Sequence, residues 1–220
     1  MASKFIYVIS GVDGSGKTSL LEATKEYITT TYPTIPFYSN KAPSGTVAGH
    51  FIRSKLLFGP RNPPLADLFL LLADMAFLTK EIGDMVTEDH IVLLDRFWGD
   101  TIAYQVFGNN TTTLEELQPY LAKFPQPLRN YWLDVSLETQ QKRLQERGKL
   151  DFFDNEKEEF WGKVKRGYEY LLKEGNKKKV SDWVYVNGEF PLDKLAQMLG
   201  EDIVYCFKKL GGKGDAKLKI

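Results

Sequence analysis

The chain has 220 residues, of which 43% are hydrophobic and 13% aromatic, which suits one domain of ordinary size and excludes intrinsic disorder for most of the chain. Lysine plus arginine and aspartate plus glutamate both number 29, so the zero net charge gives no sign of the broad positive field of a dedicated nucleic-acid binder. A single cysteine, Cys206, excludes an internal disulfide and a thiolate metal cluster. No apolar run approaches the roughly 20 residues of a membrane span, and the first ten residues lack a secretory h-region. We therefore expect a cytoplasmic protein that binds neither nucleic acid nor a membrane.

Short apolar runs rich in β-branched and aromatic residues predict buried strands. In chain order these runs are Phe5–Ser10, Pro36–Ser39, Ile91–Asp95, Tyr131–Val135 and Trp183–Val186. Helical patterns alternate with them, at residues 16–30, 65–89, 137–147, 155–175 and 191–209. This alternation predicts an α/β fold with a five-stranded parallel sheet and helices on both faces. We expect one domain over residues 1–209 and a flexible basic tail over 210–220.

Residues 11–18 read Gly-Val-Asp-Gly-Ser-Gly-Lys-Thr and fill every position of the phosphate-binding loop pattern, between a predicted strand and a predicted helix. Glycines let the backbone N–H groups turn toward an anion, and the helix N-terminus adds partial positive charge. The pattern places Lys17 on the β- and γ-phosphates and the Thr18 hydroxyl on Mg²⁺. The expected nucleoside triphosphate site comprises Gly11, Gly14, Ser15, Gly16, Lys17, Thr18 and Ser19.

A second magnesium ligand is expected where another strand ends. Asp95 follows four apolar residues, at the edge where open parallel sheets bind their ligands. An aspartate at this position also commonly caps a helix. Arg96 comes next, and a cation beside the acid suits a negatively charged acceptor, which favours the magnesium interpretation.

Several classes of protein share the phosphate-binding loop. A GTPase needs an Asn-Lys-x-Asp guanine reader and an Asp-x-x-Gly segment, but the segment 40–43 lacks the aspartate and Trp98 stands where the glycine should be. A transporter or helicase motor would be larger or would carry coupling motifs. A small phosphotransferase remains. A catalytically idle nucleotide-binding protein is the alternative from another class, and the intact Lys17, Thr18, Asp95 and Arg96 argue against it.

An ordered set of segments resembles the thymidylate kinase family. The segments are GVDGSGKT at 11–18, APSGT at 42–46 with Ile52-Arg53, LDRF at 94–97, AYQ at 103–105, WLDV at 132–135, QKRLQERGKLD at 141–151 and FWGKVKRGYEYLL at 160–172. Together they span about residues 5–190 in the order of the family. The resemblance implies a P-loop NTPase fold with a short lid, transfer of the γ-phosphoryl group of ATP-Mg²⁺ to dTMP, and a homodimer.

The resemblance also implies roles for individual residues in the acceptor site. Arg96 binds the acceptor phosphate together with Arg53, and Asp13 orients the acceptor sugar or the phosphate-binding arginine. Tyr104 lies beneath the sugar and disfavours a ribose 2′-OH, while Thr101 faces the base. The remaining expected acceptor-site residues are Pro43, Leu71 and Gln105.

A lid over residues 143–155 follows from the same resemblance. Because position 14 is glycine, the chain resembles the group whose transition-state cation comes from the lid, with Arg147 and Lys149 as candidates. Arg143 is expected to pack against the adenine. From the residues alone, two arginines four positions apart on a helix equally fit an exposed basic face.

The chain departs from the family pattern around the base. Leu71 replaces the aromatic residue that stacks on thymine, and Met75 replaces the arginine that reads it. Phe69 or Phe77 could substitute sterically, but neither can donate a hydrogen bond. Losing such a donor costs about 1–3 kcal/mol of discrimination, so we expect relaxed base specificity.

Two further departures lie at the phosphate loop of the acceptor and in the lid. Lys41-Ala42 replaces an Arg-Glu pair, and Phe152 replaces a lid arginine. The main alternative activity is a deoxynucleoside kinase, which must deprotonate a sugar hydroxyl and needs a carboxylate base. The segment 40–42, where that base is expected, contains no acid.

Overall fold

The computed structural model describes residues 5–43, 45–58, 61–147, 158–176 and 182–213. Its five strands form one parallel sheet in the order β2-β3-β1-β4-β5. Their bounds are β1 Ile6–Ser10, β2 Phe37–Lys41, β3 Ile91–Asp95, β4 Arg129–Asp134 and β5 Asp182–Asn187. The α/β prediction is confirmed, and each predicted strand lies within two residues of an observed one.

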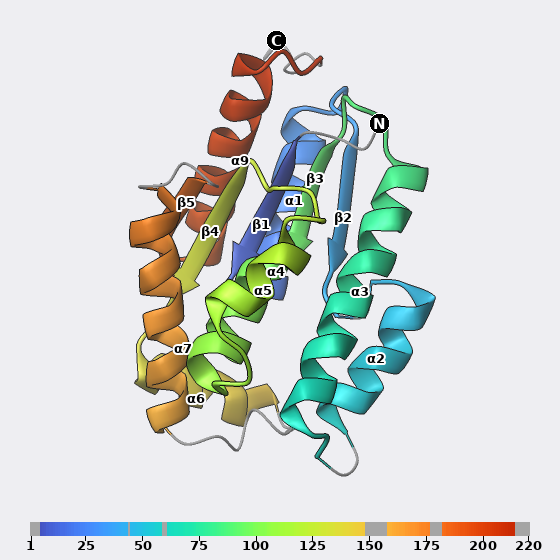
Figure 1. The fold of residues 1–220 in the computed structure, drawn as a ribbon. Coiled ribbons are helices and arrows are strands. Elements are labelled where there is room, and N and C mark those ends of the chain that lie inside the picture. The colour runs from blue at the N-terminus through green and yellow to red at the C-terminus, as the bar shows by residue number, and fades with distance from the viewer. Residues whose placement is uncertain (1–4, 44, 59–60, 148–157, 177–181, 214–220) are drawn as a thin grey trace.

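Helices cover both faces of the sheet (Figure 1) because the central strands are buried on both sides. One face packs against α1 (Lys17–Thr31) and α9 (Leu192–Lys209). The other face packs against four α-helices, which are α3 (Pro64–Met85), α4 (Trp98–Thr101), α5 (Leu114–Leu121) and α7 (Glu158–Tyr170). Two of them continue as π-helices: η1 (Ile102–Gly108) follows α4, and η3 (Leu171–Gly175) follows α7. Along β1, side chains alternate between these cores, so Tyr7 and Ile9 face α1 and α9 while Ile6 and Val8 face α3 and α7.

The remaining helices lie near the carboxyl edge of the sheet (Figure 1), where α2 spans Val47–Leu57 and α6 spans Leu137–Arg147. Parallel strands end at this common edge, so the loops after β1 and β3 meet there. Among the described residues, no helix is long and apolar enough to span a membrane.

The structure differs from the predictions at several helices. The helix α3 ends at Met85, four residues before the predicted end, because Val86 adopts an extended backbone. The helix α5 was not predicted, although the capping box of Thr113 and Glu116 signals its start. The final turns of two helices are π-helical, which the apolar periodicity does not reveal. Of the predicted lid, residues 148–155 lie outside the described residues, as does the tail beyond Lys213.

Candidate active site

The phosphate-binding loop connects β1 to α1 through glycines with positive φ angles. Gly11 has φ 155°, and a Cβ there would lie 2.5 Å from the Leu133 carbonyl oxygen of the neighbouring strand. Gly16, with φ 98°, is the N-cap of α1. A side chain at Gly11 would push the loop away from β4, which explains why the close turn needs glycine.

Lys17 is the first residue of α1, and its side chain turns back over the loop. It is 6% exposed, and its Nζ donates a hydrogen bond to the Val12 carbonyl oxygen at 2.7 Å. Burial lowers the pKa of the Lys17 ammonium to about 8, and the positive charge of Arg96 adds to this effect. The charges of Asp13, Asp95 and Asp100 raise this pKa but do not outweigh burial and Arg96, so the negative charge of a polyphosphate would further stabilise the ammonium.

Thr18 and Asp95 meet because β1 and β3 are adjacent strands whose carboxyl ends align. The Thr18 hydroxyl donates to Asp95 Oδ2 at 2.6 Å. The other carboxylate oxygen of Asp95, Oδ1, is buried and has no hydrogen-bond partner in the part of the chain that the structure describes. Two oxygen ligands, one with an unused buried lone pair, fit Mg²⁺, which usually keeps water and substrate phosphates as its other ligands. Within the described ranges, no cluster of three or more His, Cys, Asp or Glu side chains could hold a metal by itself.

The helix α6 packs against the phosphate-binding loop. The Arg143 guanidinium donates to the Ser15 carbonyl oxygen at 2.7 Å and to the Gly188 carbonyl oxygen at 3.2 Å. A Cβ at Gly14 would lie 2.9 Å from the Gln140 carbonyl oxygen, so α6 leaves no room for a side chain at position 14. Arg147 is the last residue of this helix, and Lys149 and Phe152 lie outside the described residues.

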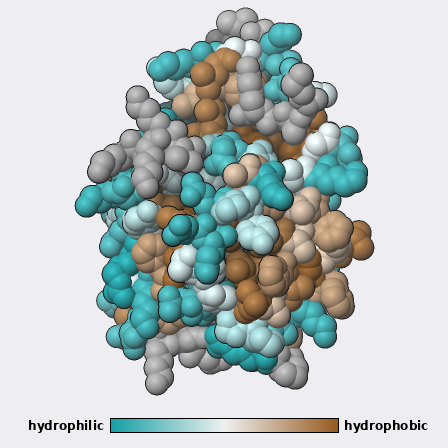
Figure 2. Space-filling model, viewed as in Figure 1, coloured by the Kyte–Doolittle hydropathy of each residue, from teal (hydrophilic) through white to brown (hydrophobic). Residues whose placement is uncertain are grey.

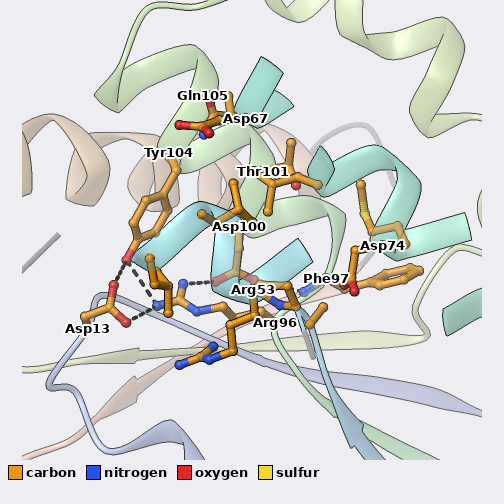
Figure 3. Close-up of a pocket in the computed structure, with 16 residues that line it drawn as sticks. Asp13, Arg53, Asp67, Asp74, Arg96, Phe97, Asp100, Thr101, Tyr104 and Gln105 are labelled. Atoms are coloured by element: carbon orange, nitrogen blue, oxygen red, sulfur yellow. Dashed lines mark hydrogen bonds and ion pairs between the residues drawn. The ribbon is translucent and has the colours of Figure 1, made fainter. Parts of the chain in front are cut away.

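Arg96 is the centre of an ion-pair cluster beside the loop (Figure 3). Its Nη2 donates to Asp13 Oδ1 at 2.7 Å and to the Tyr104 hydroxyl oxygen at 3.1 Å, and its Nη1 donates to Asp100 Oδ1 at 2.9 Å. The Tyr104 hydroxyl donates to Asp13 Oδ2 at 3.0 Å. Burial would raise the pKa of Asp13, but the charges of Arg96 and Lys17 outweigh it and lower that pKa to about 2. Asp13 is therefore a fixed anion that orients the guanidinium.

Asp100 is a site residue that the sequence analysis missed. It is 5% exposed and accepts hydrogen bonds from the Ser10 hydroxyl at 2.8 Å, the Phe97 backbone N–H at 3.1 Å and the Tyr168 hydroxyl at 2.7 Å, besides that of the arginine. The Tyr168 hydroxyl also lies 3.1 Å from the Gly11 carbonyl oxygen. Asp100 thus links Arg96 to β1 and α7 through hydrogen bonds. In the sequence, only its position one helical turn after Arg96 could have indicated its role in the site.

These side chains line a cavity between α2, α3 and the α4–η1 segment. All eight residues predicted for the acceptor site line it: Asp13, Pro43, Arg53, Leu71, Arg96, Thr101, Tyr104 and Gln105. The structure also places residues there that the sequence analysis did not assign: Ala42, Leu56, Leu57, Asp67, Asp74, Phe97 and Asp100.

Two suggested substitutes for the missing aromatic residue do not reach the cavity. Phe69 and Phe77 are 53% and 49% exposed and are not among its lining residues. Leu71 and Met75 do line it, and Met75 is 2% exposed. The suggestion that Phe69 or Phe77 substitutes for the aromatic side chain is therefore wrong, because both side chains point away from the cavity.

The lowered pKa of Lys17 predicts proton uptake when a nucleoside triphosphate binds. At about pH 8.5 much of the ligand-free lysine is neutral, and the negative charge of the phosphates raises its pKa, so a proton is taken up. Calorimetric titrations with ATP in buffers of different ionisation enthalpy measure this uptake. Less uptake is expected at about pH 6.5, where the lysine is already protonated.

The matched control for this experiment is Lys25→Ala, which removes an exposed lysine of the same helix. The control should retain the uptake of the original chain, whereas Lys17→Ala should lose it. Equal uptake in the original chain and in Lys17→Ala would show that another group takes up the proton.

Comparison with known proteins identifies the family. Residues 9–187 match the family model described as thymidylate kinase. A thymidylate kinase of Kosmotoga olearia is 29% identical over 213 residues, covering 91% of this chain and 96% of that protein. Thymidylate kinases of Carboxydothermus hydrogenoformans and Acinetobacter baumannii are 32% and 33% identical, covering 79% and 74% of this chain and 86% and 83% of those proteins. With its phosphate-binding loop, its arginine-lined cavity and these relatives, the chain belongs to the thymidylate kinase family.

Proposed function

We propose that this chain transfers the γ-phosphoryl group of ATP to the 5′-phosphate of dTMP, which gives ADP and dTDP. The observation that carries the proposal is the position of Arg96, in the acceptor cavity and directly beside the phosphate-binding loop. Asp13 belongs to the loop and binds this arginine, so one carboxylate links the donor site to the acceptor site. The family and the names of its relatives support the same reaction.

The ionisation of the acceptor favours a phosphate over a hydroxyl. A nucleoside monophosphate has a second pKa near 6 and is largely a dianion at pH 7, so it attacks without a general base. A sugar hydroxyl would need one. Asp13 is the carboxylate of the loop, and with a pKa of about 2 and its bonds to Arg96 and Tyr104 it is too weak a base for that task. These features do not favour the deoxynucleoside kinase alternative.

The reaction forms a bond from an acceptor phosphate oxygen to the γ-phosphorus while the bond to the β,γ-bridging oxygen breaks, and ADP keeps that electron pair. Lys17 neutralises charge on the β- and γ-phosphates, and Arg96 with Arg53 holds the acceptor dianion in line with them. The work of the site is to bring two anions together and stabilise the charge on the transferred group. Arg143, which donates to the Ser15 carbonyl oxygen of the loop, would pack against the adenine.

Thr18 and Asp95 would hold Mg²⁺ in the proposed reaction, since their oxygen atoms are adjacent and Asp95 Oδ1 is unused within the described residues. Bound with ATP, the ion would neutralise negative charge on the phosphates. We also propose that residues 1–209 form a single domain with a lid over residues 143–155, and that residues 210–220 form a tail. We expect the protein to act in the cytoplasm.

The choice of acceptor tests the proposal directly. With ATP and Mg²⁺, dTMP should give dTDP, while thymidine should be converted at least about a thousandfold less efficiently because Asp13, the carboxylate of the loop, is too weak a base to activate its hydroxyl. Separation of the nucleotides by chromatography measures both products. Efficient conversion of thymidine to dTMP would instead support the deoxynucleoside kinase.

We propose Arg147 as the lid cation that stabilises the transferred group. The closeness of α6 to Gly14 excludes a basic side chain at that position in the loop, and α6 ends at Arg147, one turn beyond the arginine that contacts Ser15. Arg147→Ala should lower kcat by about a hundredfold or more with little change in ATP affinity, since the charge is needed chiefly in the transition state. Steady-state kinetics and calorimetric ATP binding measure the two effects.

The neighbouring Lys142→Ala, an exposed residue on the same helix, is the control and should leave kcat unchanged. If Arg147→Ala weakens ATP binding as much as it lowers kcat/KM, the arginine serves ground-state binding rather than the transition state.

We propose that the chain forms a homodimer through α2 and α3. These helices and Phe58, which follows α2, carry exposed apolar side chains, and Figure 2 shows apolar surface gathered on that side of the molecule. The side chains are Val47, Phe51, Phe58, Leu65, Phe69, Phe77 and Met85. A contiguous apolar surface of this kind is typical of an interface.

Phe51→Glu should shift the protein from dimer to monomer, because it places a charge in the apolar interface while Lys55, one turn later, keeps the helix stable. Tyr120→Glu on α5 is the control, since Tyr120 is also half exposed but lies outside this surface. Light scattering on a size-exclusion column measures the mass. A monomeric mass for the original chain would refute the dimer.

A further inference from the structure

Tyr168 of α7 places a hydroxyl group between the phosphate-binding loop and the ion-pair cluster of Arg96. The side chain is fully buried, and its hydroxyl lies 2.7 Å from Asp100 Oδ1 and 3.1 Å from the Gly11 carbonyl oxygen. Gly11 is the first residue of the phosphate-binding loop, and Asp100 accepts a hydrogen bond from Arg96 at 2.9 Å. One hydroxyl therefore contacts both the loop and the carboxylate that holds the arginine.

The bond from this hydroxyl to the carboxylate is the stronger of the two. Burial raises the pKa of Tyr168, and the negative charge of Asp100 adds to this effect, so the hydroxyl stays protonated and donates. It has a single proton to share between its two acceptors. A charged acceptor at 2.7 Å binds that proton more strongly than a neutral carbonyl oxygen at 3.1 Å.

The carboxylate of Asp100 uses its whole capacity for hydrogen bonds. Oδ2 accepts from the Ser10 hydroxyl and from the Phe97 backbone N–H. Oδ1 accepts from Arg96 and from Tyr168. An ionised carboxylate has about four acceptor sites, so all of them are filled. Without the tyrosine hydroxyl, the buried charge on Oδ1 would be left with the guanidinium alone among the described residues and would draw it closer.

The position of the guanidinium matters because Arg96 keeps donors for an acceptor phosphate. Nη2 donates to Asp13 and to the Tyr104 hydroxyl oxygen, and Nη1 donates to Asp100. A guanidinium has five N–H groups, so these three bonds leave two of them for a phosphate. Asp100 fixes the direction in which these donors point. Misplacing a positioning group by about 1 Å can lower a reaction rate about a hundredfold.

Packing fixes the ring of Tyr168 independently of its hydroxyl. The ring stacks on Trp132, with the ring centroids 5.8 Å apart and 21° between the ring planes. At the preceding position, a Cβ on Gly167 would lie 2.8 Å from Ala103 Cα, so α7 lies directly against η1. A phenylalanine at position 168 would therefore keep the ring in place and remove only the hydroxyl.

We propose that Tyr168 is a positioning residue whose hydroxyl, acting through Asp100, orients the Arg96 guanidinium toward the acceptor phosphate. Tyr168 is not among the residues that line the cavity, so it acts through its neighbours rather than on the nucleotide. The inference rests on the proposed phosphotransfer and adds to it a residue of α7.

Tyr168→Phe in the full chain tests the proposal. With ATP and Mg²⁺ it should lower kcat/KM for dTMP about tenfold or more, because a hydrogen bond to a charged group is lost. The calorimetric affinity for ATP should stay within about twofold, since the hydroxyl acts on the acceptor side. An ATP affinity that falls as much as kcat/KM would show that the hydroxyl serves the phosphate-binding loop, and would overturn the proposal.

The matched control is Tyr7→Phe, which removes another fully buried hydroxyl. Tyr7 donates to the Ile203 carbonyl oxygen, in the core on the side of α1 and α9. Both variants should lower Tm by similar amounts, but the control should leave kcat/KM for dTMP unchanged. If Tyr168→Phe retains the kcat/KM of the control, the hydroxyl has only a structural role and the proposal is wrong.

A double-mutant cycle tests whether the hydroxyl acts through the carboxylate. In the background of Asp100→Asn, Tyr168→Phe should lower kcat/KM less than about threefold, because the bond it removes has lost its charged acceptor. A loss of about tenfold in both backgrounds would show that the two residues act independently and would overturn the assignment. If circular dichroism shows that Asp100→Asn does not fold, Arg96→Ala takes its place with the same expectation.

These outcomes also separate the inference from the proposed function. If the original chain converts dTMP and Tyr168→Phe converts it equally well, the positioning role is wrong while the proposed function stands. If the original chain converts no nucleoside monophosphate, the proposed function fails and the positioning role fails with it.

Discussion

The ion pairs of Arg96 with Asp13 and Asp100 connect the parts of this molecule. Asp13 belongs to the phosphate-binding loop after β1, and Asp100 belongs to the helix after β3, so the arginine between them joins the two loops at the carboxyl edge of the sheet. Arg96 has φ 70°, an unfavourable backbone conformation for a residue with a side chain, and costs of order 1–3 kcal/mol there. Its backbone N–H donates to the Ile9 carbonyl oxygen, and its guanidinium is held by two carboxylates, which compensate for this strain.

The charges around Arg96 suit a reaction between two anions. Arg96 and Arg53 line the cavity, Lys17 lies in the adjoining phosphate-binding loop, and the carboxylates that bind Arg96 keep its guanidinium in one orientation without an acceptor. A preorganised cation stabilises the transferred group without reorganising during the reaction. The raised pKa of Arg96, which its burial opposes and the nearby Asp13 produces, keeps the guanidinium charged at any physiological pH.

Features set by local pattern could be predicted from the sequence, and features set by distant contacts could not. The phosphate-binding loop, the five strands and the alignment of Asp95 with Thr18 follow from short motifs and from the rule that parallel strands end together. Two of the partners of Asp100 are 68 and 90 residues away in the sequence, at Tyr168 and Ser10, and nothing in its immediate neighbourhood indicates them. Asp67 and Asp74 lie within a stripe of apolar residues that predicts core packing, so their position at the cavity required the structure.

The central claim is that donor and acceptor phosphates occupy adjoining sites bridged by Asp13 and Arg96. A bisubstrate analogue, in which adenosine and thymidine are joined by a chain of five phosphates, tests it most directly through its calorimetric affinity for the original chain, Lys17→Ala and Arg96→Ala. We expect the analogue to bind at least about a hundredfold more tightly than ATP or dTMP alone, because one molecule fills both sites, and each substitution to remove most of this gain. An analogue that binds no more tightly than ATP, or whose affinity does not depend on Arg96, would contradict the account.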